Sequence, residues 1–236
     1  MPPAPKTAVP NNQLLAALPR KERLSFLSGC DMVELVYAKV MHESNQPIRH
    51  VYFPTQGMIS VIAPVNGLAS LEVGMVGNEG MLGASLVLGV RESPMHALVQ
   101  GAGSALRMSA ASFRRELAQC PALRRRLQRY VHVTIEQLAQ TAACTRFHGV
   151  QARLARWLLM TADRAHADRF HVTHQFLSYM LGVRRVGVTQ AAIALQESHL
   201  IRYSRGSVQI LDRGGLKAVS CGCYQADLAS YARLLG

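Results

Sequence analysis

The sequence lacks the features that mark secreted and membrane proteins. Its five cysteines are an odd, scattered set, unlike the even framework of a disulfide-rich secreted domain. No apolar run approaches the length that spans a bilayer, and the proline-rich first twelve residues lack the apolar core of a signal peptide. We therefore expect a soluble cytoplasmic protein with no membrane partner.

Acidic residues are scarce: 14 Asp and Glu stand against 26 Lys and Arg, for a formal charge of +12. This balance favours an acidic polymer or surface as the partner. The excess is confined to the second half, because residues 11–112 hold seven basic and seven acidic residues whereas residues 146–217 hold eleven and four. That division indicates a neutral module joined to a phosphate-binding one.

A recognisable catalytic arrangement is also missing. Glu72 and Glu79 are the close acidic candidates in the first half, and neither has an identifiable partner base or nucleophile. We therefore expect no enzyme activity, no catalytic residue and no cofactor.

The first half has the texture of a small β-roll. Asn11 or Asn12 can cap a short helix, and a second helix is expected near Pro19. Strand-like runs then follow at even spacing, which predicts an antiparallel roll or barrel. The runs are VELVYAKV, HVYFPTQGMISVIAPV, ASLEVGMVG and MHALVQGAGSALRMS, with turns expected at Asn45-Gln46-Pro47, Thr55-Gln56-Gly57, Asn66-Gly67 and Gly77-Asn78.

A long helix is expected after Pro121, following a helical start capped by Ser109 or Ser112. Apolar and small residues recur along it in steps of three and four, at Leu127, Tyr130 or Val131, Thr134, Leu138 and Thr141. This seam can pack on the chain's own roll, or it can pair with a second copy as in a coiled coil. We favour the homodimer, because a two-fold protein reads two DNA half-sites.

Residues 172–211 predict a winged helix-turn-helix. Two helical patterns, His174 to Met180 and Arg184 to Ser198, flank Gly182, which permits a tight turn. The second buries Val188, Ala191, Ala192 and Leu195, and its opposite face carries Arg184, Arg185, Thr189 and Gln190. Arginine and glutamine can each bond a base in the major groove of double-stranded DNA in a bidentate way.

A basic hairpin is expected next to this helix, turning at Ser204-Arg205-Gly206, and it brings Arg202 and Arg205 close to the DNA backbone. The segments on either side read as helices. Phe147 to Ala165 carries the single tryptophan as a core residue, and the tail after Gly215 is expected to pack against the basic module. The predicted fold is α+β: a disordered lead-in (1–12), a β-roll (13–112), a dimerisation helix (113–145) and a winged helix-turn-helix with a helical tail (146–236).

Three segments carry a resemblance to a known family: YFPTQGMISVI, the turn at residues 77–83 (GNEGMLG), and MLGVRRVGVTQAAIALQESHLIRYSRGSVQILDR. Together they resemble the Crp/Fnr superfamily of bacterial transcription regulators, and the last is similar to a subgroup with an LGVRR-x-GVT recognition helix and a Cys-x-Cys-Tyr tail, here residues 221–224. The resemblance implies a homodimer that binds a near-palindromic site and recruits or blocks RNA polymerase. It assigns base contacts to Arg185 and Gln190, and also to Arg184 and Thr189.

The resemblance also places a degenerate cyclic-nucleotide-binding-like pocket in the roll. Its expected residues are Gly77, Asn78, Glu79, Gly80, Met95 and His96. Cyclic-AMP-responsive relatives have an arginine that pairs with the cyclic phosphate where this chain has Met95 and His96, and burying a phosphate without one is costly. We therefore do not expect cyclic nucleotide as the effector, whose identity and existence stay open, and no cysteine precedes Cys30 to hold an iron–sulfur cluster as in other relatives. In the recognition helix, cyclic-AMP-responsive relatives carry a glutamate that helps to hold the DNA where this chain has Val186, so the preferred DNA site should differ from theirs.

Two alternatives remain. Cys221 and Cys223 could ligate a metal with His199 or Cys144, or respond to redox state, although thiols packed under the tail are the simpler interpretation and no metal is expected. A sequence-blind architectural DNA-binding protein would explain the charge but not the neutral roll.

Overall fold

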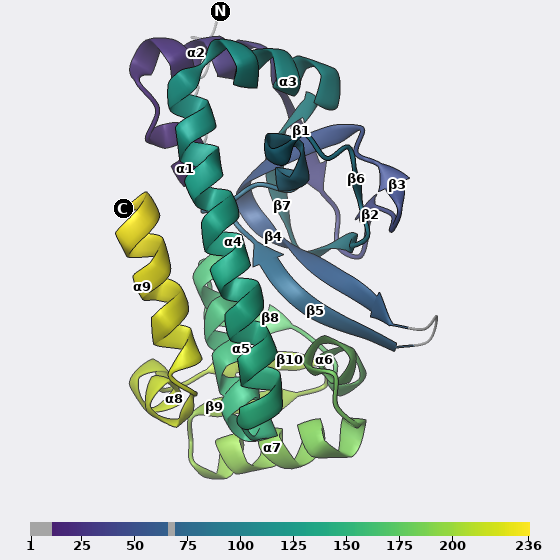
Figure 1. Ribbon diagram of the computed structural model, residues 1–236. Coiled ribbons are helices and arrows are strands. Elements are labelled where there is room, and N and C mark those ends of the chain that lie inside the picture. The colour runs from purple at the N-terminus through teal and green to yellow at the C-terminus, as the bar shows by residue number, and fades with distance from the viewer. Residues whose placement is uncertain (1–10, 66–68) are drawn as a thin grey trace, which may run out of the picture.

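The computed structural model describes residues 11–65 and 69–236. A β-roll lies at one end of the molecule and a helix-turn-helix with a small sheet at the other, and the long helix α4 (Pro121–Phe147) runs between them (Figure 1). No helix in the described part of the chain has both the length and the apolar character needed to cross a bilayer.

The first described residues are part of the folded core. The side chain of Asn12 accepts hydrogen bonds from the amides of Leu14 and Leu15 and so caps α1 (Gln13–Ala16), as predicted, and α2 (Arg20–Ser28) follows. The Asn12 amide also donates to the carbonyl oxygens of Pro54 at 3.0 Å and Gly80 at 2.9 Å. Asn12 is fully buried, so the folded chain begins before the end of the expected lead-in, whose residues 1–10 lie outside the described part.

The predicted antiparallel roll is confirmed. Its main sheet has the order β1-β7-β4-β5, with β2 also on β7, while β3 and β6 form a separate pair and a short 3₁₀ turn, η1 (Ala84–Leu88), precedes β6. The expected turn at Asn66-Gly67 falls outside the described residues. The strands are β1 (Asp31–Leu35), β2 (Val40–His42), β3 (Gln46–Pro47), β4 (His50–Val65), β5 (Ala69–Val76), β6 (Glu92–Ser93) and β7 (His96–Ser109).

Two local predictions in the roll were wrong. The run expected as one strand over residues 33–40 divides into β1 and β2 around a turn, where Ala38 has a φ of +62°. The turn expected at residues 55–57 is instead a bulge, and β4 continues through it with shifted register. Gly57 has a φ of +75°, and a Cβ there would lie 2.4 Å from the carbonyl oxygen of Gly101. Glycine here kinks a long strand against its neighbour rather than reversing the chain.

The long helix is anchored at its start by the roll. Ser109 caps α3 (Ala110–Gln119), and the Cys120 thiol accepts from the amide of Leu123 to cap α4. Leu127 and Tyr130, two members of the expected seam, are buried in the core that α4 shares with the roll, whereas Leu138 is 41% exposed. The seam therefore divides: its first half packs on the chain's own roll, whereas in its second half Leu138 is exposed and Thr134 and Thr141 are half-buried.

The second half of the chain folds around α5 (Val150–Ala165), which begins three residues later than expected because α4 extends to Phe147. A three-stranded sheet of order β8-β10-β9 lies beside the corner of α6 and α7. The tail departs from the prediction: α8 packs on α5, but α9 lies along α4 (Figure 1), where Leu235 joins the core of the roll. These elements are β8 (Arg169–His171), α6 (His174–Leu181), α7 (Arg185–Glu197), β9 (Ile201–Ser204), β10 (Ser207–Ile210), α8 (Arg213–Val219) and α9 (Cys223–Leu235).

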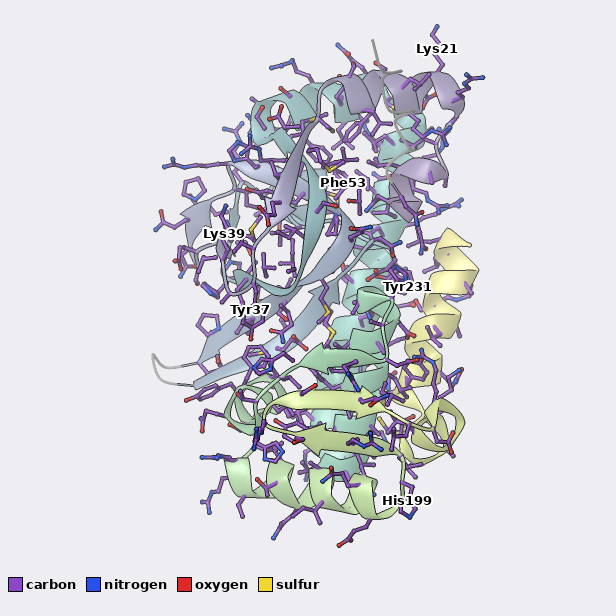
Figure 2. The ribbon with its side chains drawn as sticks, turned by 180° about the vertical axis from the view of Figure 1, so that it is seen from behind. Lys21, Tyr37, Lys39, Phe53, His199 and Tyr231 are labelled. Carbon is purple, nitrogen blue, oxygen red and sulfur yellow. The ribbon has the colours of Figure 1, made fainter. Side chains whose placement is uncertain are left out.

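An aromatic pair packs inside the roll, and a buried acid links the roll to the second half of the chain. Phe53 lies inside the roll, with its ring centroid 5.3 Å from that of Phe26 (Figure 2). The β4–β5 hairpin packs against the other half, where Ile62 and Met75 share a core with α5. The Trp157 indole donates to Glu72 at 2.7 Å across this junction.

Candidate nucleic-acid interface

The corner between α6 and α7 forms as the sequence predicted. The Thr173 hydroxyl caps α6 by accepting from the amide of Phe176, and Gly182 ends the helix in the left-handed region with a φ of +61°. The Gly182 amide donates back to the last turn of α6, which satisfies carbonyls that a helix end would otherwise leave unpaired. The chain therefore changes direction at Gly182, and α7 begins at Arg185 with a different axis.

The inner face of α7 is apolar and fully packed. Its buried residues are the four that the helical spacing predicted, Val188, Ala191, Ala192 and Leu195. They join the core formed by α5 and α6, so α7 is fixed in orientation about its own axis. The residues opposite them must therefore face solvent.

The outer face of α7 carries Arg184, Arg185 and Gln190, all exposed, and none of them makes a side-chain hydrogen bond to another described residue. Thr189 differs from these three. It is half-buried, and its hydroxyl donates to the Arg185 carbonyl at 3.1 Å and lies 3.0 Å from Nδ1 of His174. Three of the four expected base-contacting side chains are thus free to reach a partner, and Thr189 is held against α6.

Two apolar side chains on the same face were not among the predicted site residues. Val186 is 60% exposed and Ile193 is 45% exposed, and they lie seven residues apart with Gln190 between them. A spacing of four and seven places these residues on one helix face, which is the signal that could have identified them. Exposed apolar side chains beside arginine and glutamine can contact the methyl group of thymine.

The hairpin of β9 and β10 stands beside α7, and the two residues that join its strands, Arg205 and Gly206, both have positive φ, +50° and +79°. Positive φ at both positions is typical of the type I′ turn that suits a tight hairpin. Arg202 and Arg205 are exposed on it, as expected for a basic wing.

The wing is fastened to the corner by Tyr203. Its ring stacks on His174 with centroids 4.3 Å apart, and its hydroxyl donates to the Val172 carbonyl at 2.6 Å. Burial and then the nearby charge of Arg185 lower the pKa of His174 from its ordinary value, so the imidazole is neutral at physiological pH and adds no charge to the surface. Helix and wing therefore form one rigid, positively charged surface.

A cavity of about 260 Å³ opens between the roll and α4. Of the six residues expected in an effector pocket, Met95 lines it. The Gly77–Gly80 turn is held elsewhere: Glu79 pairs with Arg164 at 2.8 Å, and a Cβ on Gly80 would lie 2.4 Å from the Tyr130 hydroxyl. Asn78 is buried in that turn, and His96 lies 3.1 Å from Glu43.

The cavity lining is mostly apolar. Four methionines contribute to it, and none of the described side chains that line it is an arginine or a lysine. Two lining side chains, His42 and Gln137, have buried Nε2 atoms without a hydrogen-bond partner in the described chain. The lining suits an apolar molecule with few hydrogen-bonding atoms better than a phosphate.

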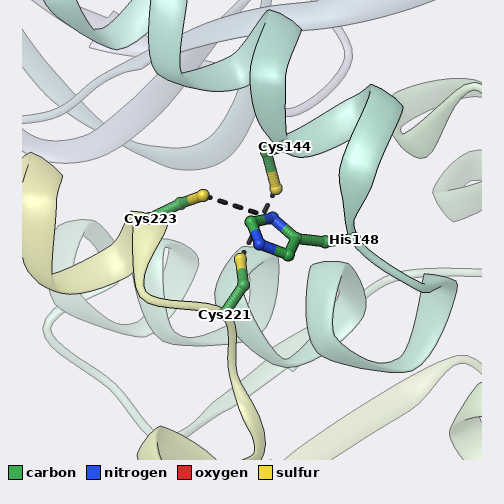
Figure 3. A group of neighbouring side chains, drawn as sticks. All are labelled: Cys144, His148, Cys221 and Cys223. Carbon is green, nitrogen blue, oxygen red and sulfur yellow. Dashed lines mark hydrogen bonds between the residues drawn. The ribbon is translucent and has the colours of Figure 1, made fainter.

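Four side chains that could hold a metal gather where α4 ends: Cys144, His148, Cys221 and Cys223 (Figure 3). The sequence analysis identified the three thiols of this group as possible ligands, but it suggested His199 rather than His148 as the histidine. His199 lies beyond the end of α7, where its side chain points away from the body of the protein (Figure 2). The spacing of four residues between Cys144 and His148 at a helix end is the signal that was missed.

Comparison with known proteins agrees with this geometry. Residues 152–219 match the family of Crp-like helix-turn-helix domains. The second half of the chain contains a Crp-like helix-turn-helix domain. The match covers α5 to α8 and so includes the corner, α7 and the wing. No curated protein matches the chain.

Solved structures share the fold of most of this chain at low sequence identity. FixK2 from Bradyrhizobium japonicum has a TM-score of 0.69 at 12% identity, over 81% of this chain and 98% of its own. The regulator CLP from Xanthomonas campestris is described as responsive to c-di-GMP. It has a TM-score of 0.67 at 16% identity, over 81% of this chain and 99% of its own. TTHB099, a CRP-family transcriptional regulator from Thermus thermophilus, has a TM-score of 0.66 at 16% identity, over 80% of this chain and 96% of its own.

Proposed function

We propose that this protein is a homodimeric transcription regulator that reads double-stranded DNA through its Crp-like domain and acts on RNA polymerase. The main support for this proposal is the outer face of α7. Arg184, Arg185 and Gln190 are exposed there and make no side-chain hydrogen bond to another described residue, while the inner face of the helix is buried. Arg185 and Gln190 reach base edges in the major groove, and Arg184 and Thr189 lie at the start and side of the same face.

The wing supplies the sequence-independent part of the binding. Arg202 and Arg205 are exposed on a hairpin whose Tyr203 stacks on His174 of α6, so their charges are held next to α7. Arginines at this position neutralise phosphates of the DNA backbone and release counterions, which makes the affinity depend on salt.

The outward-facing half of α4 pairs two copies. Ile135 is 54% exposed and Leu138 is 41% exposed, and with the exposed Ala142 they follow a spacing of three and four residues. An apolar stripe with this spacing is typical of a two-helix contact. In this proposal residues 13–112 form the regulatory roll, 113–145 join the two copies and 146–236 bind DNA.

Cyclic nucleotides are not the expected effectors. The cavity between the roll and α4 has no described arginine or lysine in its lining to balance a phosphate, and Glu79 is engaged by Arg164. An effector of this cavity would be mainly apolar. Isothermal titration with cyclic AMP should show no binding, and the cyclic nucleotide should leave DNA affinity unchanged.

The proposal is tested by selecting bound sites from random DNA. We expect a near-palindromic site, bound more tightly than random DNA by roughly 10³ or more at physiological salt. Arg185→Ala should weaken that site by about 1–3 kcal/mol and relax the preference at one base position, because a bidentate contact is lost. The matched control is Arg20→Ala, since Arg20 is exposed on α2 at the opposite end of the molecule (Figure 1).

Two results would overturn the proposal. If no sequence competes better than random DNA, the protein is an architectural binder that responds to charge alone. If Arg185→Ala keeps the full base preference, α7 does not lie in the groove in this orientation.

A further inference from the structure

We propose that Cys144, His148, Cys221 and Cys223 form a structural zinc site that ties the end of α4 to the start of α9. One ligand atom from each lies within 4.8 Å of every other. Two of these separations are 3.5 Å, between the Sγ atoms of Cys144 and Cys221, and 3.4 Å, between Sγ of Cys223 and Nδ1 of His148. Figure 3 shows the three sulfur atoms and the imidazole converging from two separate segments.

These separations fit one tetrahedral ion. Zinc bonds of about 2.3 Å to sulfur and 2.0–2.1 Å to nitrogen place ligand atoms roughly 3.5–3.8 Å apart at tetrahedral angles. Three thiolates and one imidazole are a common set for structural zinc, and all four positions are supplied by the protein. The ligands of an iron–sulfur cluster are spread over several irons, so a set this compact favours a single ion.

Local structure positions each ligand. Cys144 and His148 are four residues apart at the end of α4, so both side chains lie on one side of the helix, and the His148 amide donates to the Cys144 carbonyl at 3.1 Å. Cys221 and Cys223 straddle Gly222, which is the N-cap of α9. The three cysteines are buried, and His148 lies on the exposed side of the site.

The surroundings suit an anionic metal centre. Zinc with three thiolates and a neutral imidazole carries one net negative charge. Arg153 is buried and donates to the Leu181 carbonyl, and no described acidic residue forms an ion pair with it. Its charge lies near Cys144 and Cys221. A buried guanidinium without a counter-ion is costly, and the metal centre supplies the missing charge.

Neighbouring side chains hold the ligands in place. The Gln140 amide donates to Sγ of Cys223 at 2.9 Å, and Arg156, beside Cys144, pairs with the buried Asp227 of α9 at 2.7 Å. Such contacts orient metal ligands and adjust their affinity. They also show that α4, α5 and α9 meet at this point.

The position of the site gives the ion a mechanical role. Between α4 and α5 the chain passes through His148 and Gly149 alone, so this is where the Crp-like domain joins the long helix. A bound ion fixes His148 to the segment that follows α8 and thereby closes a loop around the whole domain. We expect it to restrict the angle between α4 and α5 and to keep α9 against α4. This role is independent of which DNA sequence the domain binds.

The test is the metal content of the full-length protein, purified under reducing conditions with zinc present and then dialysed. We expect one zinc per chain by mass spectrometry of the elements, and Co²⁺ in its place should give the strong visible absorption of tetrahedral thiolate coordination. Cys221→Ser and His148→Gln should lose the metal, whereas His148→Cys should retain it because a thiolate replaces the imidazole. Cys30→Ser and His199→Gln are the matched controls and should keep full zinc content.

A second measurement does not require a variant to fold. Chelation of the wild-type protein should speed amide hydrogen exchange at residues 144–150 and 221–235 and leave the roll unchanged, and added zinc should restore it. Gln140→Ala should weaken zinc affinity by about 10–100-fold.

Three results would overturn the zinc assignment. The purified protein could contain no metal and have thiols that react freely with a thiol reagent, it could contain a disulfide between Cys144 and Cys221 despite the reducing conditions, or it could contain iron together with sulfide. The assignment would equally fail if the control variants lost as much zinc as the ligand variants.

Discussion

At the scale of single residues, Glu72 is a buried acid with two hydrogen-bond donors around it. The Ser60 hydroxyl donates to Oε2 at 2.5 Å and the Trp157 indole donates to Oε1 at 2.7 Å. Burial outweighs both bonds and raises the pKa of Glu72 from 4.5 to about 7. The folded protein therefore holds a proton here that the unfolded chain releases at lower pH.

This proton makes stability depend on pH. Between pH 4.5 and about 7 the folded state binds the proton and the unfolded state does not, so the free energy of unfolding should fall as the pH rises across that window. The fall attributable to Glu72 is on the order of 3 kcal/mol at most. Glu72→Gln should remove it, because an amide can accept from Trp157 and donate to the Ser60 oxygen as the protonated acid does. Urea unfolding at pH 5 and pH 8 measures the difference, and Glu34→Gln, at an exposed position, should keep the wild-type dependence.

Arg205 is a residue whose charge can be removed without disturbing its turn. Its φ is +50°, and asparagine adopts positive φ more readily than arginine does. In the proposed DNA complex, Arg205→Asn should weaken binding to all sequences alike and reduce the slope of log affinity against log salt by about one. Fluorescence anisotropy at several salt concentrations measures this slope. A change in base preference would instead place Arg205 in a groove.

At the scale of elements, α4 shows how one helical pattern can serve two surfaces. Leu127 and Tyr130 are buried by the roll, while Ile135 and Leu138 are exposed on the same helix. The predicted seam runs in steps of three and four from Leu127 and Tyr130 through Thr134 to Leu138, so periodicity does not distinguish its buried part from its exposed part. Which part faces the roll is decided by where β5, η1 and α9 contact the helix.

The exposed part of α4 provides a test of the proposed dimer. Ile135→Asp places a charge where two apolar helices would meet, and burying that charge is costly, so the protein should sediment as a monomer at micromolar concentration. Leu24→Asp is the control, because Leu24 is equally exposed, at 54%, but lies on α2. A wild-type protein that is already monomeric, with and without DNA, would contradict the proposed dimer.

At the scale of the whole molecule, the roll and the Crp-like domain share a core. Ile62 and Met75 of the β4–β5 hairpin pack with α5, and Trp157 reaches across to Glu72. Arg164 of α5 also pairs with Glu79 in the roll at 2.8 Å. Motion of one half is therefore coupled to the other through buried contacts rather than through α4 alone.

This shared core predicts cooperative unfolding. The fluorescence of Trp157, the single tryptophan, reports the junction, and far-UV circular dichroism reports both halves. The two transitions in urea should coincide, because exposing the junction removes core from each half. A separate early transition in fluorescence would show that the halves unfold independently.

The sequence by itself determined the order and type of the main elements and which face of α7 is buried. Strand runs of the right length, caps at Asn12 and Ser109, and the four buried positions of α7 are local signals, since turns, caps and amphipathic faces depend on residues close together in the chain. Prediction from the sequence is limited for the same reason. A glycine such as Gly57 is expected in a bulge as well as in a turn, and the tail sequence does not indicate which helix it packs against.

Only the tertiary structure decided what depends on distant contacts. It holds the expected Gly77–Gly80 segment against Tyr130 and Arg164 rather than around the cavity, and it brings His148 rather than His199 to the thiols. Cys144 and Cys221 are separated by 77 residues, yet their sulfur atoms lie 3.5 Å apart because α9 folds back along α4. That return path is stabilised by the apolar face of α9, which packs against the core that α4 shares with the roll.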